Sequence, residues 1–180
     1  MKPPRLRSKF ASVLLTLGWS ALSPSAVTAQ ELPAPDPADV RSIDAIITAT
    51  YDVISGPADE PRDWDRFRSL FAPGARLIPT DNGPQMTTAD EYAEAADQFF
   101  RQTSFFEREL GRVVEQYGWI AHAFSSYESR TDPDGPVIDS GVNSFQLYFD
   151  GRRWWIVTIL WDRASRAGPI PERYRRNRAQ

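Results

Sequence analysis

The only histidine of the chain, His122, is the side chain best suited to acid–base chemistry near neutral pH. It lies in a run from 119 to 130 whose residue pattern is typical of a β-strand. Phe124 and Ser126 share its strand face, and the apolar Ile120 and Phe124 predict that this face is buried. We therefore expect His122 to be a catalytic candidate, with Phe124 and Ser126 binding ligand. The alternative interpretation is a hydrogen-bonded core or rim histidine.

Three further side chains are candidates for binding a ligand. Tyr51 lies in the apolar stripe of a helix and carries a polar tip. Trp64 opens the apolar stripe of the next helix. Asn143 shares a strand face with Phe145, so it would be a polar group in an apolar pocket if that face meets the helices. The alternative is that Asn143 satisfies a backbone group at a bulge beside Gly141.

One pair of carboxylates, Glu107 and Glu109, shares a strand face, a spacing that can raise the pKa of one member. Because Arg108 and Arg112 are close in sequence, we interpret this group as a solvated, charge-paired surface. With one histidine and no cysteine, no metal site is expected. No motif for a phosphate or a dinucleotide is present, so no cofactor is expected.

The first 29 residues have the pattern of a cleaved signal peptide. Basic residues precede the apolar run 10–22, and small residues lead to a predicted cleavage after Ala29. The remaining chain has 17 basic residues, all arginine, against 24 acidic ones, a net charge near −7. This charge argues against nucleic-acid binding. We expect an exported protein, periplasmic or secreted, without stable membrane insertion after cleavage.

Helical and strand periods follow one another in a definite order. Residues 30–39 form a Pro-rich leader, with Asp39 as the expected N-cap of the first helix. Thr88 and Glu91 have the spacing of a capping box. The turn at Gly151 joins two long strands into a hairpin. The predicted elements are helices over 40–54, 64–71 and 88–101, a short strand over 75–79, and strands over 105–117, 119–130, 137–149 and 152–162.

This order resembles the nuclear-transport-factor-2-like superfamily, which includes ketosteroid isomerase, scytalone dehydratase and the SnoaL-like polyketide cyclases. The resemblance covers about residues 40–162. It implies an α+β domain in which a cone-shaped, curved antiparallel sheet packs against three helices around an apolar pocket. It also implies frequent dimerisation through the sheet. The stretches that carry it are IITATYDVI, WDRFRSLFAPGARLIP, WIAHAFSSYESR and GVNSFQLYFDGRRWWIVTILW.

The resemblance does not extend to the catalytic residues of ketosteroid isomerase. In that pattern a tyrosine near the position of Tyr51 donates to an enolate oxygen, and a carboxylate at the end of the first strand is the base. The matching position here is Pro79, which cannot accept a proton. Asp81 lies two residues later in a turn. This departure makes steroid isomerisation improbable.

Three functions are consistent with these observations. The first is the binding of a small apolar molecule in the pocket, without strong catalysis. The second is a SnoaL-like cyclase, isomerase or dehydratase with His122 as acid or base. The third is a protein-interaction module that uses the sheet face and the Arg-rich, extended tail 163–180. Because Trp154 and Trp155 must face opposite ways, one is expected in the pocket and the other in a homodimer interface.

The signal peptide can be tested directly. When the full chain is expressed in a bacterium with a general secretory pathway, we expect the exported protein to begin at Gln30. Intact-mass measurement of the periplasmic or secreted fraction checks this. A product that retains the apolar run would contradict the predicted cleavage.

Overall fold

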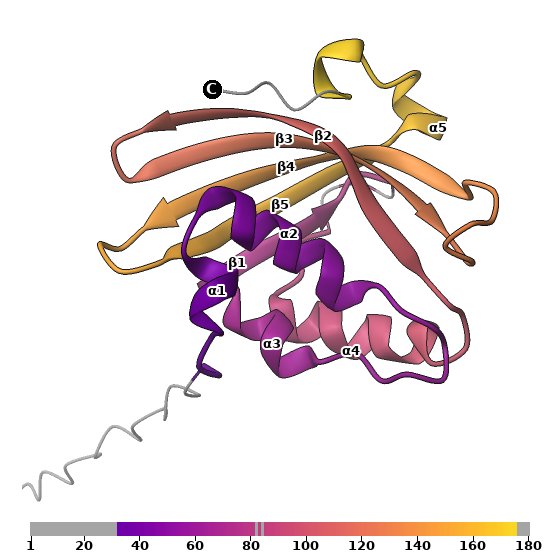
Figure 1. Ribbon diagram of the computed structural model, residues 1–180, viewed down its shortest axis with the longest axis horizontal. Coiled ribbons are helices and arrows are strands. Elements are labelled where there is room, and N and C mark those ends of the chain that lie inside the picture. The colour runs from indigo at the N-terminus through magenta and orange to yellow at the C-terminus, as the bar shows by residue number, and fades with distance from the viewer. Residues whose placement is uncertain (1–31, 82, 84, 176–180) are drawn as a thin grey trace, which may run out of the picture. The chain divides into compact units, whose positions relative to one another are not determined.

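The chain has an α+β fold in which helices cover one face of a five-stranded sheet (Figure 1). The structure, a computed structural model, describes residues 32–81, 83 and 85–175, so the predicted signal peptide and the end of the tail lie outside it. None of the helices in these ranges is long and apolar enough to cross a membrane. The elements are α1 (Pro37–Val40), α2 (Ile43–Ile54), α3 (Trp64–Ser69), β1 (Phe71–Pro79), α4 (Ala89–Phe100), β2 (Phe106–Tyr117), β3 (Ile120–Arg130), β4 (Asp139–Phe149), β5 (Trp154–Arg163), α5 (Ala164–Ala167) and the 3₁₀ helix η1 (Glu172–Tyr174).

The sheet is mixed, because its first strand runs parallel to its last. The strand order is β1-β5-β4-β3-β2, and β2 to β5 pair antiparallel with their neighbours. The predicted α+β class and the four long antiparallel strands are confirmed. The sheet differs from the expected antiparallel one in β1 alone, which pairs parallel with β5. Parallel pairing requires a long crossover, and here α4 and three strands lie between the two partners.

The first predicted helix is divided in two. Asp36 caps α1 and Ser42 caps α2, each accepting a hydrogen bond from a backbone N–H of the first turn. The prediction that Asp39 caps one helix from Val40 is therefore wrong, and α1 includes the end of the predicted leader. Asp39 instead accepts two hydrogen bonds from Arg66 of α3, of 2.7 and 2.9 Å. The Asp39 carboxylate therefore links the short helices α1 and α3.

Alternation along β3 and β4 decides which side chains meet the helices. In β4, Asn143 faces the helices, which is the condition of its ligand-binding interpretation. In β3, Ser125 and Tyr127 face them, whereas His122 and Phe124 lie on the opposite side of the sheet. The prediction that the Phe124 side of β3 lines the pocket is therefore wrong. Both faces of β3 carry apolar side chains, so the residue types did not distinguish them.

The segment after β5 covers the outer face of β2 and β3. In η1, the ring of Tyr174 stacks on Phe124 with centroids 5.2 Å apart. The hydroxyl of Ser126, which is fully buried, donates to the carbonyl oxygen of Tyr174 at 2.5 Å. Ile170 is also buried, with 7% of its surface exposed. The prediction of an extended tail is therefore wrong for residues 164–174, which pack on the sheet.

The end of α2 is joined to the start of β2 by hydrogen bonds. The N–H of Gly56 donates to the carbonyl of Phe105 at 2.7 Å, and the N–H of Phe105 donates back at 3.0 Å. The N–H of Glu107 donates to the hydroxyl of Ser55 at 2.9 Å. Gly56 has a φ of 153°, and a Cβ there would lie 2.9 Å from the Arg62 guanidinium. Glycine is required at this junction for both reasons.

Arg62 supplies the hydrogen-bond donors that the junction needs. Its residue surface is only 7% exposed, and its charge lies over the ring of Phe100, 5.2 Å from the centroid. A helix end leaves carbonyl groups without partners, and Arg62 satisfies them here. At 2.5–3.0 Å, the guanidinium donates to the carbonyl oxygens of Ile54, Gly56, Pro57 and Glu60.

Replacing Arg62 tests the importance of this junction. We expect Arg62→Met to lower the free energy of unfolding by about 2–4 kcal/mol, because several buried carbonyl groups lose charged donors. Arg101→Met is the matched control, since Arg101 pairs with Asp97 on an exposed helix face and should cost less than about 1 kcal/mol. Urea denaturation followed by tryptophan fluorescence measures both. Equal losses would contradict the assigned role.

Candidate functional site

A cavity of about 770 Å³ lies between the inner face of the sheet and helices α2 and α4. Much of its wall is aromatic: α4 contributes Tyr92 and Phe100, Phe105 precedes β2, and Trp161 comes from β5. This volume lies within the range of pockets that hold small molecules, roughly 300–1,000 Å³. The apolar pocket expected from the sequence is therefore present in the fold.

Trp64, a predicted ligand-binding residue, supports the cavity wall without lining it. Its ring stacks on Phe100 with centroids 6.0 Å apart and meets Phe67 edge-on at 5.5 Å. Its indole N–H donates to Asp97 at 2.8 Å. Phe67 and Phe100 do line the cavity, so Trp64 fixes the rings that a ligand would touch.

Glu107 places a carboxyl group in this largely apolar wall. The pKa of Glu107 is raised to about 8, first because burial disfavours the charged form and second because Asp139 lies nearby. A hydrogen bond from Asn143 and the charge of Arg163 act in the opposite direction. By surface area Glu107 is half-buried, since part of its side chain faces the cavity. The carboxyl is therefore protonated at neutral pH and can exchange its proton near pH 8.

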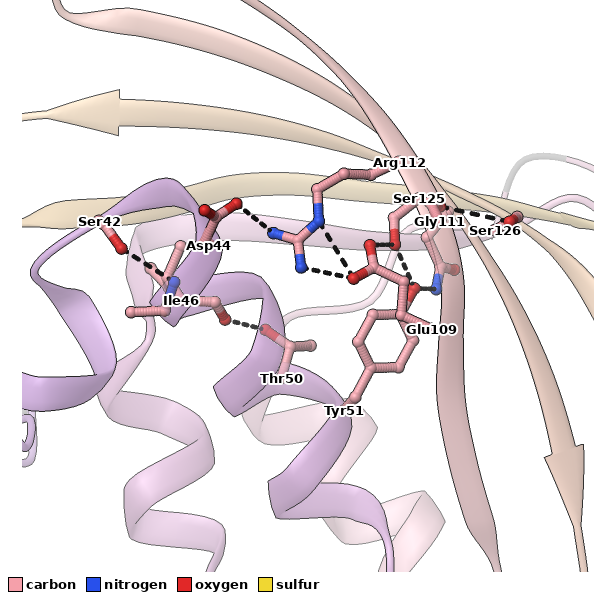
Figure 2. A network of polar contacts seen from close by, with 12 residues as sticks. Ser42, Asp44, Ile46, Thr50, Tyr51, Glu109, Gly111, Arg112, Ser125 and Ser126 are labelled. Carbon is pink, nitrogen blue, oxygen red and sulfur yellow. Dashed lines mark hydrogen bonds and ion pairs between the residues drawn. The ribbon is translucent and has the colours of Figure 1, made fainter. Parts of the chain in front are cut away.

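Tyr51 of α2 also lines the cavity, and its hydroxyl is bonded on two sides (Figure 2). The side-chain amide of Asn143 donates to it at 3.0 Å, and Ser125 Oγ lies 2.7 Å away. Ser125 donates its one hydroxyl hydrogen to Glu109 at 2.5 Å, because a carboxylate can only accept. Tyr51 must then donate to Ser125. Its hydroxyl hydrogen is committed to the protein, and burial raises the pKa of Tyr51.

This chain of hydrogen bonds continues to the surface through Arg112 (Figure 2). Arg112 donates to Glu109 at 3.1 and 2.5 Å and to Asp44 of α2 at 3.0 Å. The side chain of Glu109 is 15% exposed, whereas that of Asp44 is 85% exposed. Glu109 is charge-paired, as interpreted from the sequence, but it is not solvated. The charge-paired interpretation is wrong for Glu107, which lines the cavity, while its basic neighbours Arg108 and Arg112 pair with Glu128 and Glu109.

Arg163 of the cavity lining pairs with two aspartates. The Nε of Arg163 lies 3.2 Å from a carboxylate oxygen of Asp81 and 3.2 Å from one of Asp139. The side chain of Arg163 is 48% exposed. Asp139 and Arg163 line the cavity, so among the residues that the structure describes its charged lining comprises Glu107, Asp139 and Arg163. Asp81 adds a further negative charge beside Arg163.

His122, Phe124 and Ser126 lie on the sheet face away from this cavity. The Nε2 of His122 is 3.0 Å from the hydroxyl of Ser144, and its ring meets Phe124 edge-on at 4.8 Å. His122 borders a smaller hollow of about 250 Å³ on that outer face. The predicted acid or base is therefore separated by the sheet from the apolar cavity. The alternative interpretation, a hydrogen-bonded histidine at the rim, describes its surroundings.

The structure brings together two of the predicted site residues, Tyr51 and Asn143, which are 92 residues apart in sequence. The amide of Asn143 donates to the side chain of Tyr51. The alternative interpretation, in which Asn143 satisfies a backbone group at a bulge, is therefore not supported. Glu107 was missed as a cavity residue. Its spacing from Glu109 was the available signal, and the neighbouring arginines obscured it.

Comparison with known proteins supports the fold. No protein family model and no curated protein matches the sequence. Solved structures do match, and they include a protein of unknown function with a cystatin-like fold from Nostoc punctiforme, at 10% identity and a TM-score of 0.55. That match covers 67% of this chain and 87% of the other.

Two further structures have the same architecture. An NTF-2-like protein of unknown function from Silicibacter pomeroyi is 14% identical, with a TM-score of 0.51, covering 68% of this chain and 93% of the other. A candidate ketosteroid isomerase from Parabacteroides distasonis is 11% identical, with a TM-score of 0.52, covering 76% of this chain and 99% of the other. The described domain therefore has the nuclear-transport-factor-2-like fold.

The raised pKa of Glu107 predicts how stability depends on pH. Between the ordinary value of 4.5 and about 8, the folded state holds a proton that the unfolded state has lost, so stability falls as pH rises and levels off above 8. Glu107→Gln should lack this fall. Over this pH range, the free energy of unfolding of the original chain should fall by a few kcal/mol relative to that of Glu107→Gln, since one pKa unit corresponds to about 1.4 kcal/mol.

Urea denaturation at a series of pH values measures this difference. Glu115→Gln is the matched control, because Glu115 lies exposed on the same strand. Parallel stability curves for the original chain and Glu107→Gln would mean that the carboxyl titrates normally.

Proposed function

We propose that this chain binds a small, largely apolar molecule in the cavity between its sheet and helices α2 and α4. The observation that carries the proposal is an aromatic-walled space of about 770 Å³ with the carboxyl group of Glu107 in its wall. A pocket that is mostly apolar with a few convergent polar groups is the usual form of a small-molecule site. The apolar body of the ligand would lie against the rings, and its polar group would meet Glu107.

An acid–base enzyme is the second candidate, and the observation that favours it is again Glu107. A carboxyl with a pKa near neutrality can take up or release a proton during a reaction. In this reading Glu107 replaces His122, which lies across the sheet from the cavity. The hydroxyl hydrogen of Tyr51 is already donated to Ser125. Because of this, Tyr51 does not serve as a donor to a substrate oxygen in the arrangement described.

Export and dimerisation remain proposals. Export depends on the predicted signal peptide. The homodimer would use the outer sheet face, where Trp155 lies opposite the buried Trp154 and next to Tyr148 on the adjacent strand. Ile120 and Tyr148 are large apolar residues exposed there, at 61% and 40%. The segment 164–174 covers another part of this face, which limits how much of it a partner could contact.

Filling the cavity tests the binding proposal. Naphthylmethanol, a neutral probe, should bind the mature chain with a Kd below about 1 mM, as followed by calorimetry. Ala96 lines the cavity on α4, so Ala96→Trp should weaken binding by at least about tenfold by occupying the space. Glu94→Trp adds the same side chain at an exposed position of α4 and should leave affinity unchanged.

His122→Ala completes the set. Because His122 lies on the outer face, this variant should keep the affinity of the original chain. Binding that survives Ala96→Trp but is lost in His122→Ala would place the ligand in the smaller outer hollow and overturn the proposal.

A further inference from the structure

The Tyr51 hydroxyl and the Asn143 amide, which lie near Glu107 in the cavity wall, both donate their hydrogens within the protein. Tyr51 donates to Ser125, and Asn143 donates to Tyr51. Asn143 also forms a side-chain hydrogen bond to Glu107. Neither group has a hydrogen left to donate to a ligand beside Glu107, and the Glu107 carboxyl can donate only while it keeps its proton.

Arg163, which lines the cavity, is likewise paired with groups of the protein. It stands 3.2 Å from both Asp81 and Asp139, so two negative charges accompany its one positive charge. When Glu107 is ionised, this end of the cavity carries a net negative charge. An anionic ligand would be repelled, and a cation would find an uncompensated carboxylate.

The aromatic wall favours a cation as well. The Tyr92 and Trp161 rings meet edge-to-face at 6.3 Å, and the Phe100 and Phe105 rings are 5.1 Å apart. All four side chains line the cavity that contains Glu107. The faces of such rings attract an ammonium group, with greater strength where water is excluded. Acceptors, negative charge and aromatic faces thus occur in one cavity.

We infer that the ligand of this cavity is an apolar organic ammonium ion, whose charged nitrogen pairs with the Glu107 carboxylate and whose hydrocarbon body lies against the aromatic wall. This inference rests on the proposed binding function and adds the charge of the ligand to it. On binding, Glu107 transfers its proton to solvent, and the carboxylate pairs with the cation. The ammonium group keeps its own proton.

The pH dependence of binding follows from this proton release. Below pH 8 the cation must displace a proton from Glu107, so its affinity should increase with pH and become constant above about 8. Burial raises the pKa of the three tyrosines that interact with Glu107, so they stay neutral in this range. The titratable and charged groups that face Glu107 are Tyr51 of α2, Tyr92 of α4, Tyr127 of β3, Asp139 of β4 and Arg163 of β5.

The experiment compares two probes of the same shape, naphthylmethylamine and naphthylmethanol, by calorimetry on the mature chain from about pH 6 to about pH 8.5. At the highest pH we expect the amine to bind at least about tenfold more tightly than the alcohol. Its affinity should rise by up to about tenfold per pH unit below pH 8. Measurement in buffers of different ionisation enthalpy should show release of up to about one proton at low pH.

Variants show whether Glu107 is responsible. Glu107→Gln should abolish the preference for the amine and its pH dependence. Glu115→Gln, the exposed control on the same strand, should retain both properties. Equal affinity for the two probes, or a preference that survives Glu107→Gln, would overturn the inference while the binding proposal stands. If neither probe binds, the binding proposal fails, and the inference fails with it.

Discussion

The hydrogen-bonded junction between the end of α2 and the start of β2 is the constraint on which the cavity depends. It comprises the paired backbone bonds of Gly56 and Phe105, the Ser55 contact to the Glu107 backbone, and the guanidinium of Arg62. The helix that carries Tyr51 and the strand that carries Glu107 are joined there. Because these contacts involve backbone groups that must be satisfied, they hold the two elements at a set separation. The cavity between α2 and the sheet can then persist, because the helix and the strand cannot move together to fill it.

Around this junction the polar groups are arranged so that each buried donor has an acceptor. Asn143, Tyr51, Ser125 and Glu109 form one connected series, and Arg112 links it to the protein surface. No buried side-chain nitrogen or oxygen lacks a partner within the described residues. Such satisfied series make the local structure rigid, because moving one member leaves its neighbours unpaired. Glu107 differs from these groups because its proton depends on pH.

The sequence predicted the fold well, because local signals agreed with one another. The capping box of Thr88 and Glu91 is present, and the turn at Gly151 joins β4 to β5. The site was predicted less well. Strand alternation placed Asn143 and Phe145 on one side of β4 without deciding that this side faces the helices. It failed at His122, because both sides of β3 carry apolar residues and η1 packs on part of the outer side. The setting of Glu107 depends on Asp139 and Arg163, which are distant in sequence, so no local pattern indicated it.

The parallel pairing of β1 with β5 also determines when the sheet can be completed. Phe71 of β1 pairs with Ile156 of β5, so the sheet cannot acquire this strand until most of the chain is available. Contacts between residues so distant in sequence slow folding, since a long loop must close before they form. During synthesis, β1 is therefore made before the strand with which it pairs. A chain with this connectivity completes its sheet late in folding. Such a delay is compatible with the predicted export, which would occur before the chain folds.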